Sequence, residues 1–231
     1  MPRRQAVSSF GGCSFIFLAL SGPTRVYSGT MTCEELQMIL GKADAPVILL
    51  EGTRALPEGD AAKLEVIARR LAEAYPRARF RTGNAEGADA AFARGVATVD
   101  PARLEYVLPY GGHRKKALAS KSYQITLTDL PKVAEARAAR DTADASPAYG
   151  SLLAKRETVP SVGAKARYLL RDTLKVTGSP ENGLPPATVG LFYVNIRDPM
   201  KGGTGHTIRV CRRQGVPVAF QGDWMGWFSA E

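Results

Sequence analysis

Residues that bind metals or form disulfides are scarce in this chain. Its 231 residues include three cysteines, Cys13, Cys33 and Cys211, and two histidines, His113 and His206, with no CxxC motif. An odd number of cysteines without metal-ligand spacing argues against a disulfide framework and against a structural zinc site. We therefore expect neither a bound metal nor a cofactor.

Long apolar runs are also missing. A membrane-spanning helix needs about 20 apolar residues, whereas the apolar stretch 13–20 is far shorter. Arg3 and Arg4 precede this stretch and small residues come after it, so residues 1–30 are interpreted as a weak signal-like segment or as a disordered extension ahead of Met31. The sequence after Met31 is typical of a cytoplasmic nucleotide-type domain. We therefore favour the extension, a cytoplasmic location and no membrane partner.

Two common phosphate-binding motifs are absent. The P-loop pattern G-x-x-x-x-G-K-[ST] does not occur, and no G-x-G-x-x-G follows the first predicted strand. These absences argue against a P-loop protein and against a standard dinucleotide-binding domain. An anionic partner is still expected, because the chain has a formal net charge of +9.

The sequence does contain a regular alternation of strands and helices. Apolar runs of strand length are followed by segments with helical spacing, which predicts a mostly parallel sheet with right-handed crossovers. Residues 31–231 are thus expected to form one Rossmann-like α/β domain with about five strands flanked by helices. The predicted strands are 46–50, 79–82, 104–108, 189–194 and 216–220.

The segment 122–186 departs from this alternation. Residues 133–145 are rich in alanine and charge, and a second helix is predicted to begin near Ser161. Proline and glycine residues mark loops between and after these helices. We interpret 122–186 as a helical insertion before the fourth strand.

Three glycine-bearing turns each follow a predicted strand. Ligands of open parallel sheets bind beyond the carboxyl ends of the strands, where the strand order reverses, so we expect the turns to converge on one crevice. Glycine lets backbone N–H groups approach a phosphate, and threonine and arginine side chains can add hydrogen bonds. Either Thr204 or Thr207 is expected to cap the helix after the third turn. The candidate ligand-binding residues are Gly52, Thr53, Arg54, Gly83, Asn84, Ala85, Glu86, Asp89, Gly202, Gly203, Thr204, Gly205, His206 and Thr207.

The three turns also resemble a known superfamily. The stretches EGTR, RTGNAEGADAAFARG and GGTGHTIRVCRRQGVPV are similar to the SLOG superfamily of Rossmann-like domains. That group includes the DNA-processing protein A family, the LOG cytokinin-activating phosphoribohydrolases and small bacterial nucleotide sensors. The resemblance covers about 46–112 and 187–222. It implies a site for a nucleotide or nucleotide-derived ligand, and, because such domains often pair, a homodimer is among the expected assemblies.

The resemblance leaves open whether the protein is an enzyme. The LOG motif P-G-G-x-G-T-x-x-E matches at its three glycines, but Lys201, His206 and Arg209 stand in place of its proline, threonine and glutamate. The missing glutamate would stabilise an oxocarbenium-like centre during cleavage of an N-glycosidic bond. A carboxylate from another turn could replace it, and the candidates are Glu51, Glu86 and Asp89. A sensor that only binds nucleotide is therefore favoured over a hydrolase, and the catalytic residues are unknown.

A third interpretation is a module that binds single-stranded nucleic acid, as in the DNA-processing branch. A cluster of cations supports it, and Tyr110 and Tyr123, which flank the cluster, could stack on bases. Such a module would bind oligonucleotides with an affinity that falls steeply with salt. The cluster comprises Arg114, Lys115, Lys116 and Lys121.

Overall fold

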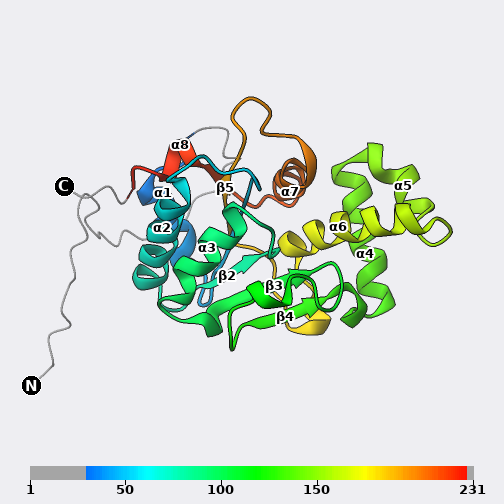
Figure 1. The fold of residues 1–231 in the computed structure, drawn as a ribbon, viewed down its shortest axis with the longest axis horizontal. Helices are drawn as coiled ribbons and strands as arrows, with labels where there is room; N and C mark the ends of the chain where they lie inside the picture. The colour runs from blue at the N-terminus through cyan, green and yellow to red at the C-terminus, as the bar shows by residue number, and fades with distance from the viewer. Residues whose placement is uncertain (1–29, 228–231) are drawn as a thin grey trace, which may run out of the picture.

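Six parallel strands form the centre of the fold (Figure 1). The computed structural model describes residues 30–227. Within them the strands lie in the order β4-β3-β2-β1-β5-β6, so the order reverses between β1 and β5. The Rossmann-like α/β class expected from the sequence is confirmed. The strands are β1 (Val47–Gly52), β2 (Arg79–Thr82), β3 (Leu104–Leu108), β4 (Tyr123–Thr126), β5 (Val189–Tyr193) and β6 (Val218–Phe220).

Helices cover both faces of this sheet (Figure 1). One face carries α1 (Cys33–Gly41), α2 (Asp60–Ala74), α3 (Ala88–Ala97) and the short α8 (Gln221–Trp224). The other carries α4 (Lys132–Ala145), α6 (Pro160–Thr177) and α7 (Gly202–Arg213). The one-turn helix α5 (Gly150–Ala154) packs on α4 and α6. No helix within residues 30–227 is both long and apolar enough to cross a lipid bilayer.

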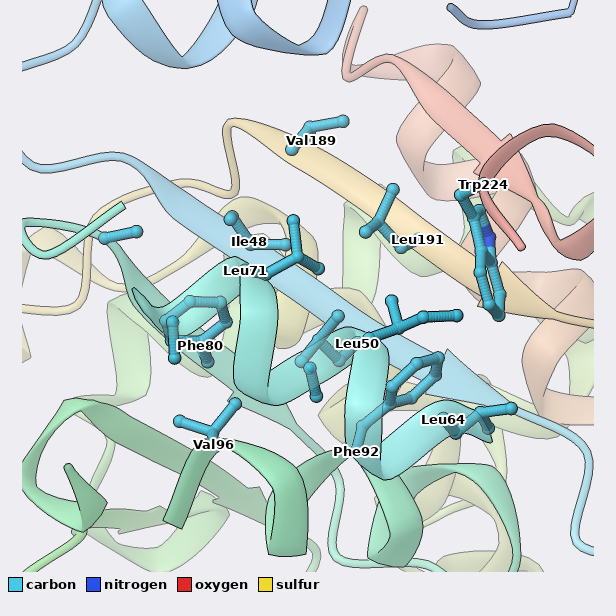
Figure 2. Close-up of a cluster of buried hydrophobic side chains, with 14 of the residues drawn as sticks. Ile48, Leu50, Leu64, Leu71, Phe80, Phe92, Val96, Val189, Leu191 and Trp224 are labelled. Atoms are coloured by element: carbon cyan, nitrogen blue, oxygen red, sulfur yellow. The ribbon is translucent and has the colours of Figure 1, made fainter. Parts of the chain in front are cut away.

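Alternation along β1 explains how the two helical layers share one sheet. Ile48 and Leu50 belong to the core beneath α1, α2 and α3, whereas Leu49 packs on the opposite side with residues of α7. Both faces are therefore buried, which accounts for the continuous apolar sequence of the strand. Figure 2 shows the first of these cores, in which Phe92 and Trp224 meet edge to face, with ring centroids 5.7 Å apart.

The prediction of about five strands misses β4. Only Ile125 of its four residues is buried, and Tyr123 and Gln124 are exposed. A short strand at the edge of a sheet needs little apolar sequence, because one side of it faces solvent. Its pairing with β3 nevertheless runs over four residues, from Glu105 with Tyr123 to Leu108 with Thr126.

The interpretation of 122–186 as a separate helical insertion is also corrected. This segment contains β4, and it contains α6, whose buried Leu170 and Leu174 pack against Val107 of β3 and Ile125 of β4. Helix α6 is thus the crossover that leads to β5. The two predicted helices themselves are present as α4 and α6.

The third glycine turn proves to be the first turn of α7. The helix begins at Gly202, with Lys201 as its N-cap residue, and neither Thr204 nor Thr207 caps it. Instead the Thr207 hydroxyl donates to the Glu51 carboxylate at 3.0 Å. The prediction of a signal-like or disordered segment over residues 1–30 cannot be compared with the structure, because only residue 30 of that segment is described.

Candidate functional site

The three predicted turns lie in contact at the carboxyl edge of the sheet. The hydroxyl of Thr204 in α7 donates to the Gly52 carbonyl at 3.2 Å. The Ala88 N–H, at the start of α3, donates to the Thr53 carbonyl at 3.0 Å. Segments that lie about 150 residues apart along the chain are therefore joined by hydrogen bonds. The three turns therefore meet at one edge of the sheet, as expected, and that they form one ligand crevice stays a prediction.

The Asp89 carboxylate occupies the space between the first two turns. One oxygen accepts the backbone N–H of Gly52 at 3.2 Å, and the other accepts those of Gly83 at 3.2 Å and Ala85 at 3.3 Å. Asp89 is buried. The N–H groups that were expected to face a ligand are thus already bound by a side chain of the protein.

Packing accounts for the glycines of these two turns. A Cβ at Gly52 would lie 2.2 Å from the Tyr193 carbonyl oxygen, and one at Gly83 would lie 2.0 Å from Arg171 Nη1. Both distances are far below any real Cβ contact, so a larger residue would force the neighbours apart. At Gly52 the clash is with backbone, so glycine there is required by the fold itself, whether or not a ligand binds. At Gly83 an added Cβ would instead displace the buried Arg171 guanidinium.

The start of α7 is the part of the crevice that stays open. Gly202 and Gly203 are exposed, and the first helical hydrogen bond runs from the Gly205 N–H to the Lys201 carbonyl at 3.2 Å. The N–H groups of residues 202–204 therefore have no partner within the helix. Beside them, between the ends of β1 and β5, lies a pocket of about 190 Å³. It is lined by Thr53, Val194, Asn195, Asp198, Pro199, Lys201 and Thr204.

A cluster of buried charged side chains, which the sequence analysis did not predict, lies beneath the carboxyl edge of the sheet. Lys175 Nζ lies 2.5 Å from Glu51 Oε2 and 2.9 Å from Asp172 Oδ1, and Arg171 Nε lies 2.9 Å from the same Asp172 oxygen. Arg171 also donates to the Gly83 carbonyl at 2.6 Å. The cluster thus ties α6 to the ends of β1 and β2. Arg171, Asp172 and Lys175 interrupt the leucines of α6, and that interruption was the signal in the sequence.

The balance of charge in this cluster affects Glu51. Burial raises the pKa of Glu51 to about 7, and the negative charges of Asp172 and Asp89 add to the rise that Lys175 opposes. Although burial alone would raise it, Arg171 and Lys175 hold the pKa of Asp172 below its ordinary value. Three buried carboxylates, Glu51, Asp89 and Asp172, lie near only two buried cations, Arg171 and Lys175. Glu51 is the carboxylate whose negative charge is least stabilised, and it therefore keeps its proton to the highest pH.

His206 does not lie on a loop of the crevice, as the sequence suggested. It is fully buried within α7, where Nδ1 lies 2.9 Å from Ser146 Oγ and Nε2 lies 3.0 Å from Thr173 Oγ1. Burial lowers its pKa to about 4. Both ring nitrogens are thus used to hold α7 against α6 and the end of α4. Arg209 joins the same contact, since its Nε donates to Ser146 Oγ at 2.8 Å.

The second turn is locked to the loop after β3. Asn84 has a positive φ of 57°, and its side-chain amide donates to the carbonyls of His113 at 3.1 Å and Arg114 at 3.3 Å. Arg114 returns a bond to the Asn84 carbonyl at 3.2 Å. Glu86 is exposed, 3.6 Å from the Arg114 guanidinium. Asn84 therefore holds the second turn against the loop after β3, whereas Glu86 and Arg54 are exposed on the surface.

The two tyrosines expected to flank the cationic cluster lie at opposite edges of the sheet. Tyr123 pairs with Glu105 at the amino end of β3, whereas Tyr110 follows the carboxyl end of that strand. The Tyr123 hydroxyl donates to the Asn182 carbonyl at 3.0 Å. The two rings therefore do not form one stacking surface around the lysines.

Comparison of the chain with models of protein families, with curated proteins and with solved structures found no match. The similarity to the SLOG superfamily therefore stays a prediction from the residues. Within the part of the chain that the structure describes, no group of three or more His, Cys, Asp or Glu side chains is placed to hold a metal ion.

Proposed function

We propose that this protein binds a nucleotide or nucleotide-derived ligand, with the phosphate of the ligand at the start of α7. The observation that carries the proposal is the position of the 190 Å³ pocket, which lies between the ends of β1 and β5 where the strand order reverses. That is the point at which open parallel sheets bind their ligands.

The chemistry of the pocket suits a phosphate. Residues 202–204 present three N–H groups without helical partners at the positive end of the α7 dipole. Lys201 brings a cation, and Thr53 and Thr204 line the same space. The Asp198 carboxylate, which also lines it, suits the hydroxyl groups of a sugar rather than a second phosphate.

The size of the pocket limits what it encloses. Sites that enclose a whole small molecule measure roughly 300–1,000 Å³, and this pocket is smaller at about 190 Å³. It therefore fits the phosphate and part of the sugar. The remainder of the ligand would lie on the surface beside it.

Binding without hydrolysis is the better supported role. Asp89, a candidate carboxylate for glycosidic cleavage, accepts three backbone N–H groups and is buried. Glu51 is held by Lys175 and Thr207 and is also buried. Glu86 alone among the three candidates is exposed.

A thermal-shift titration with nucleoside monophosphates tests the proposal. A ligand that binds the native state raises the melting temperature by mass action, and we expect a rise at millimolar ligand. Replacing the exposed cation in Lys201→Ala should reduce that rise. The matched control is Lys42→Ala, which removes another exposed lysine, one that precedes β1 at the opposite edge of the sheet.

The same samples separate binding from hydrolysis. No rise with any of the nucleotides, or an equal rise in Lys201→Ala, would refute a phosphate site at α7. Release of free base that stops in a Glu86→Gln variant would instead make the protein a hydrolase.

A further inference from the structure

Three aromatic rings gather beside the candidate site. Tyr110, in the loop after β3, and His113 meet edge to face with centroids 5.2 Å apart. Tyr168 of α6 lies 5.9 Å from the His113 ring and 6.5 Å from the Tyr110 ring. The three rings are close to perpendicular to one another, at 77–89°. We call Tyr110, His113 and Tyr168 the ring cluster.

The ring cluster is open to solvent on one side and carries an unused polar atom. Tyr110 is 41% exposed and Tyr168 is half-buried. His113 is only 9% exposed, yet its Nδ1 has no hydrogen-bond partner among the described residues. A buried polar atom without a partner costs free energy, and the position of this one next to exposed aromatic surface makes it available to a ligand.

Helix α6 connects the ring cluster to the start of α7. The Arg171 guanidinium lies 5.6 Å from the centre of the Tyr168 ring. The next residue, Asp172, lies directly beneath Gly203, where a Cβ would meet its Oδ2 at 2.8 Å. Tyr168 and Asp172 are four residues apart, about one helical turn or ~6 Å. Residues one turn apart on α6 thus contact the ring cluster and the start of α7.

Arg54 of the first turn affects the ring cluster through its charge. Thr53 lines the pocket, and Arg54 comes directly after it. Burial, together with Arg171, Arg114 and Arg54, lowers the pKa of His113. Its ring is therefore neutral at pH 7, and Nδ1 can donate or accept a hydrogen bond according to its tautomer.

We propose that the ring cluster is the base subsite of the nucleotide ligand: the base stacks on the exposed ring of Tyr110, and His113 Nδ1 bonds to an edge of the base. This inference rests on the proposed function, since it needs the phosphate at the start of α7. It adds the chemical class of the second half of the ligand, a planar heteroaromatic ring with polar edge atoms. It also explains why the enclosed pocket is too small for a whole nucleotide.

Isothermal titration with AMP and with ribose 5-phosphate tests the subsite, because the two probes differ by the base alone. Stacking on one aromatic side chain contributes enough to change affinity roughly tenfold to a hundredfold. The wild-type protein should bind AMP at least tenfold more tightly than ribose 5-phosphate. Tyr110→Ala should remove most of that difference while leaving the affinity for ribose 5-phosphate unchanged, and Tyr110→Phe should keep it.

The outcomes separate this inference from the proposed function. If the wild-type protein binds both probes equally, or if Tyr110→Ala binds AMP as tightly as the wild type does, the base subsite is refuted and the phosphate site stands. If the protein binds neither probe, both proposals fail. If Tyr110→Ala weakens both probes alike, Tyr110 has a structural role and the subsite is refuted. Melting curves of the variants confirm that each is folded.

Discussion

The Asp89 carboxylate accepts the backbone N–H of Gly52 at 3.2 Å, so a side chain of the protein takes the hydrogen bond that a ligand was expected to accept. Asp89 lies at the beginning of α3 and Gly52 at the end of β1. An anion bound by the first two turns would have to displace a buried carboxylate. The relationship therefore moves the candidate phosphate site to α7, the third element at the same edge.

We predict that Asp89 stabilises the fold. An Asp89→Ala variant would leave three backbone N–H groups without their acceptor, and an unsatisfied buried donor costs about 1–3 kcal/mol. The free energy of unfolding should fall by at least about 2 kcal/mol in urea denaturation monitored by circular dichroism. Asp89→Asn, which keeps one acceptor oxygen, should lose less. A loss below about 0.5 kcal/mol for the alanine variant would show that these bonds contribute little.

The close packing of α7 against the loop before it gives a second prediction. A Cβ at Gly205 would lie 1.9 Å from the Met200 carbonyl oxygen, which is backbone and cannot rotate away. Gly205→Ala should therefore destabilise the protein by more than about 2 kcal/mol. A methyl group added at Gly41, at the end of α1, would have nothing within 4 Å, so Gly41→Ala is the matched control and should be neutral or slightly stabilising. Equal melting temperatures for the two variants would contradict the tight packing.

The raised pKa of Glu51 gives a pH-dependent prediction. Its pKa is about 7 in the folded protein, where burial is the main cause, against an ordinary value of 4.5. Between these values the native state binds more protons than the unfolded state, so this group makes the free energy of unfolding fall as the pH rises from 4.5 to 7. The fall ends above pH 7, where Glu51 is ionised in both states.

A variant without the titrating group isolates this effect. The difference in free energy of unfolding between the wild type and Glu51→Gln should shift by about 3 kcal/mol across that range, at ~1.4 kcal/mol per pKa unit. As the pH rises, the free energy of unfolding of the wild type should fall relative to that of Glu51→Gln. A difference that stays constant from about pH 4 to pH 8 would mean that folding does not change the pKa of Glu51.

The exposed lysines after β3 are predicted to play no part in nucleotide binding. Lys115 and Lys116 are exposed in a short 3-10 helix, and neither lines the pocket. A double Lys115→Ala, Lys116→Ala variant should show the same nucleotide-induced rise in melting temperature as the wild type. A gel-shift series with single-stranded oligonucleotides at several salt concentrations tests whether these lysines bind nucleic acid instead. Tight binding that is lost in the double variant and falls steeply with salt would favour the nucleic-acid interpretation.

Much of the fold could be predicted because its elements have strong local signals. The strands β1, β2, β3, β5 and β6 and the helices α4 and α6 are found where the sequence places them, within a few residues. The edge strand β4 was missed because solvent exposure relaxes its apolar pattern. The role of α6 as a crossover helix was missed because it depends on contacts with β3 and β4, which are distant in sequence.

The candidate site was predictable in outline only. The convergence of the three turns follows from parallel topology, which brings all carboxyl strand ends to one edge. The topology does not show which N–H groups of the turns remain free for a ligand. Asp89 lies only six residues after Gly83, and from the sequence alone it could be an exposed side chain or a buried hydrogen-bond acceptor. The inward orientation of His206 depends on Ser146 and Thr173, which lie far from it along the chain.

The most direct test of the central claim is a nuclear magnetic resonance titration of the backbone amides with AMP. If the phosphate binds at the start of α7, the N–H signals of Gly202, Gly203 and Thr204 should show the largest shifts, and those of Gly52 and Gly83, bound to Asp89, should change little. The account is contradicted if the largest shifts fall on Gly52 and Gly83, or if the signals of residues 202–204 do not move at saturating AMP.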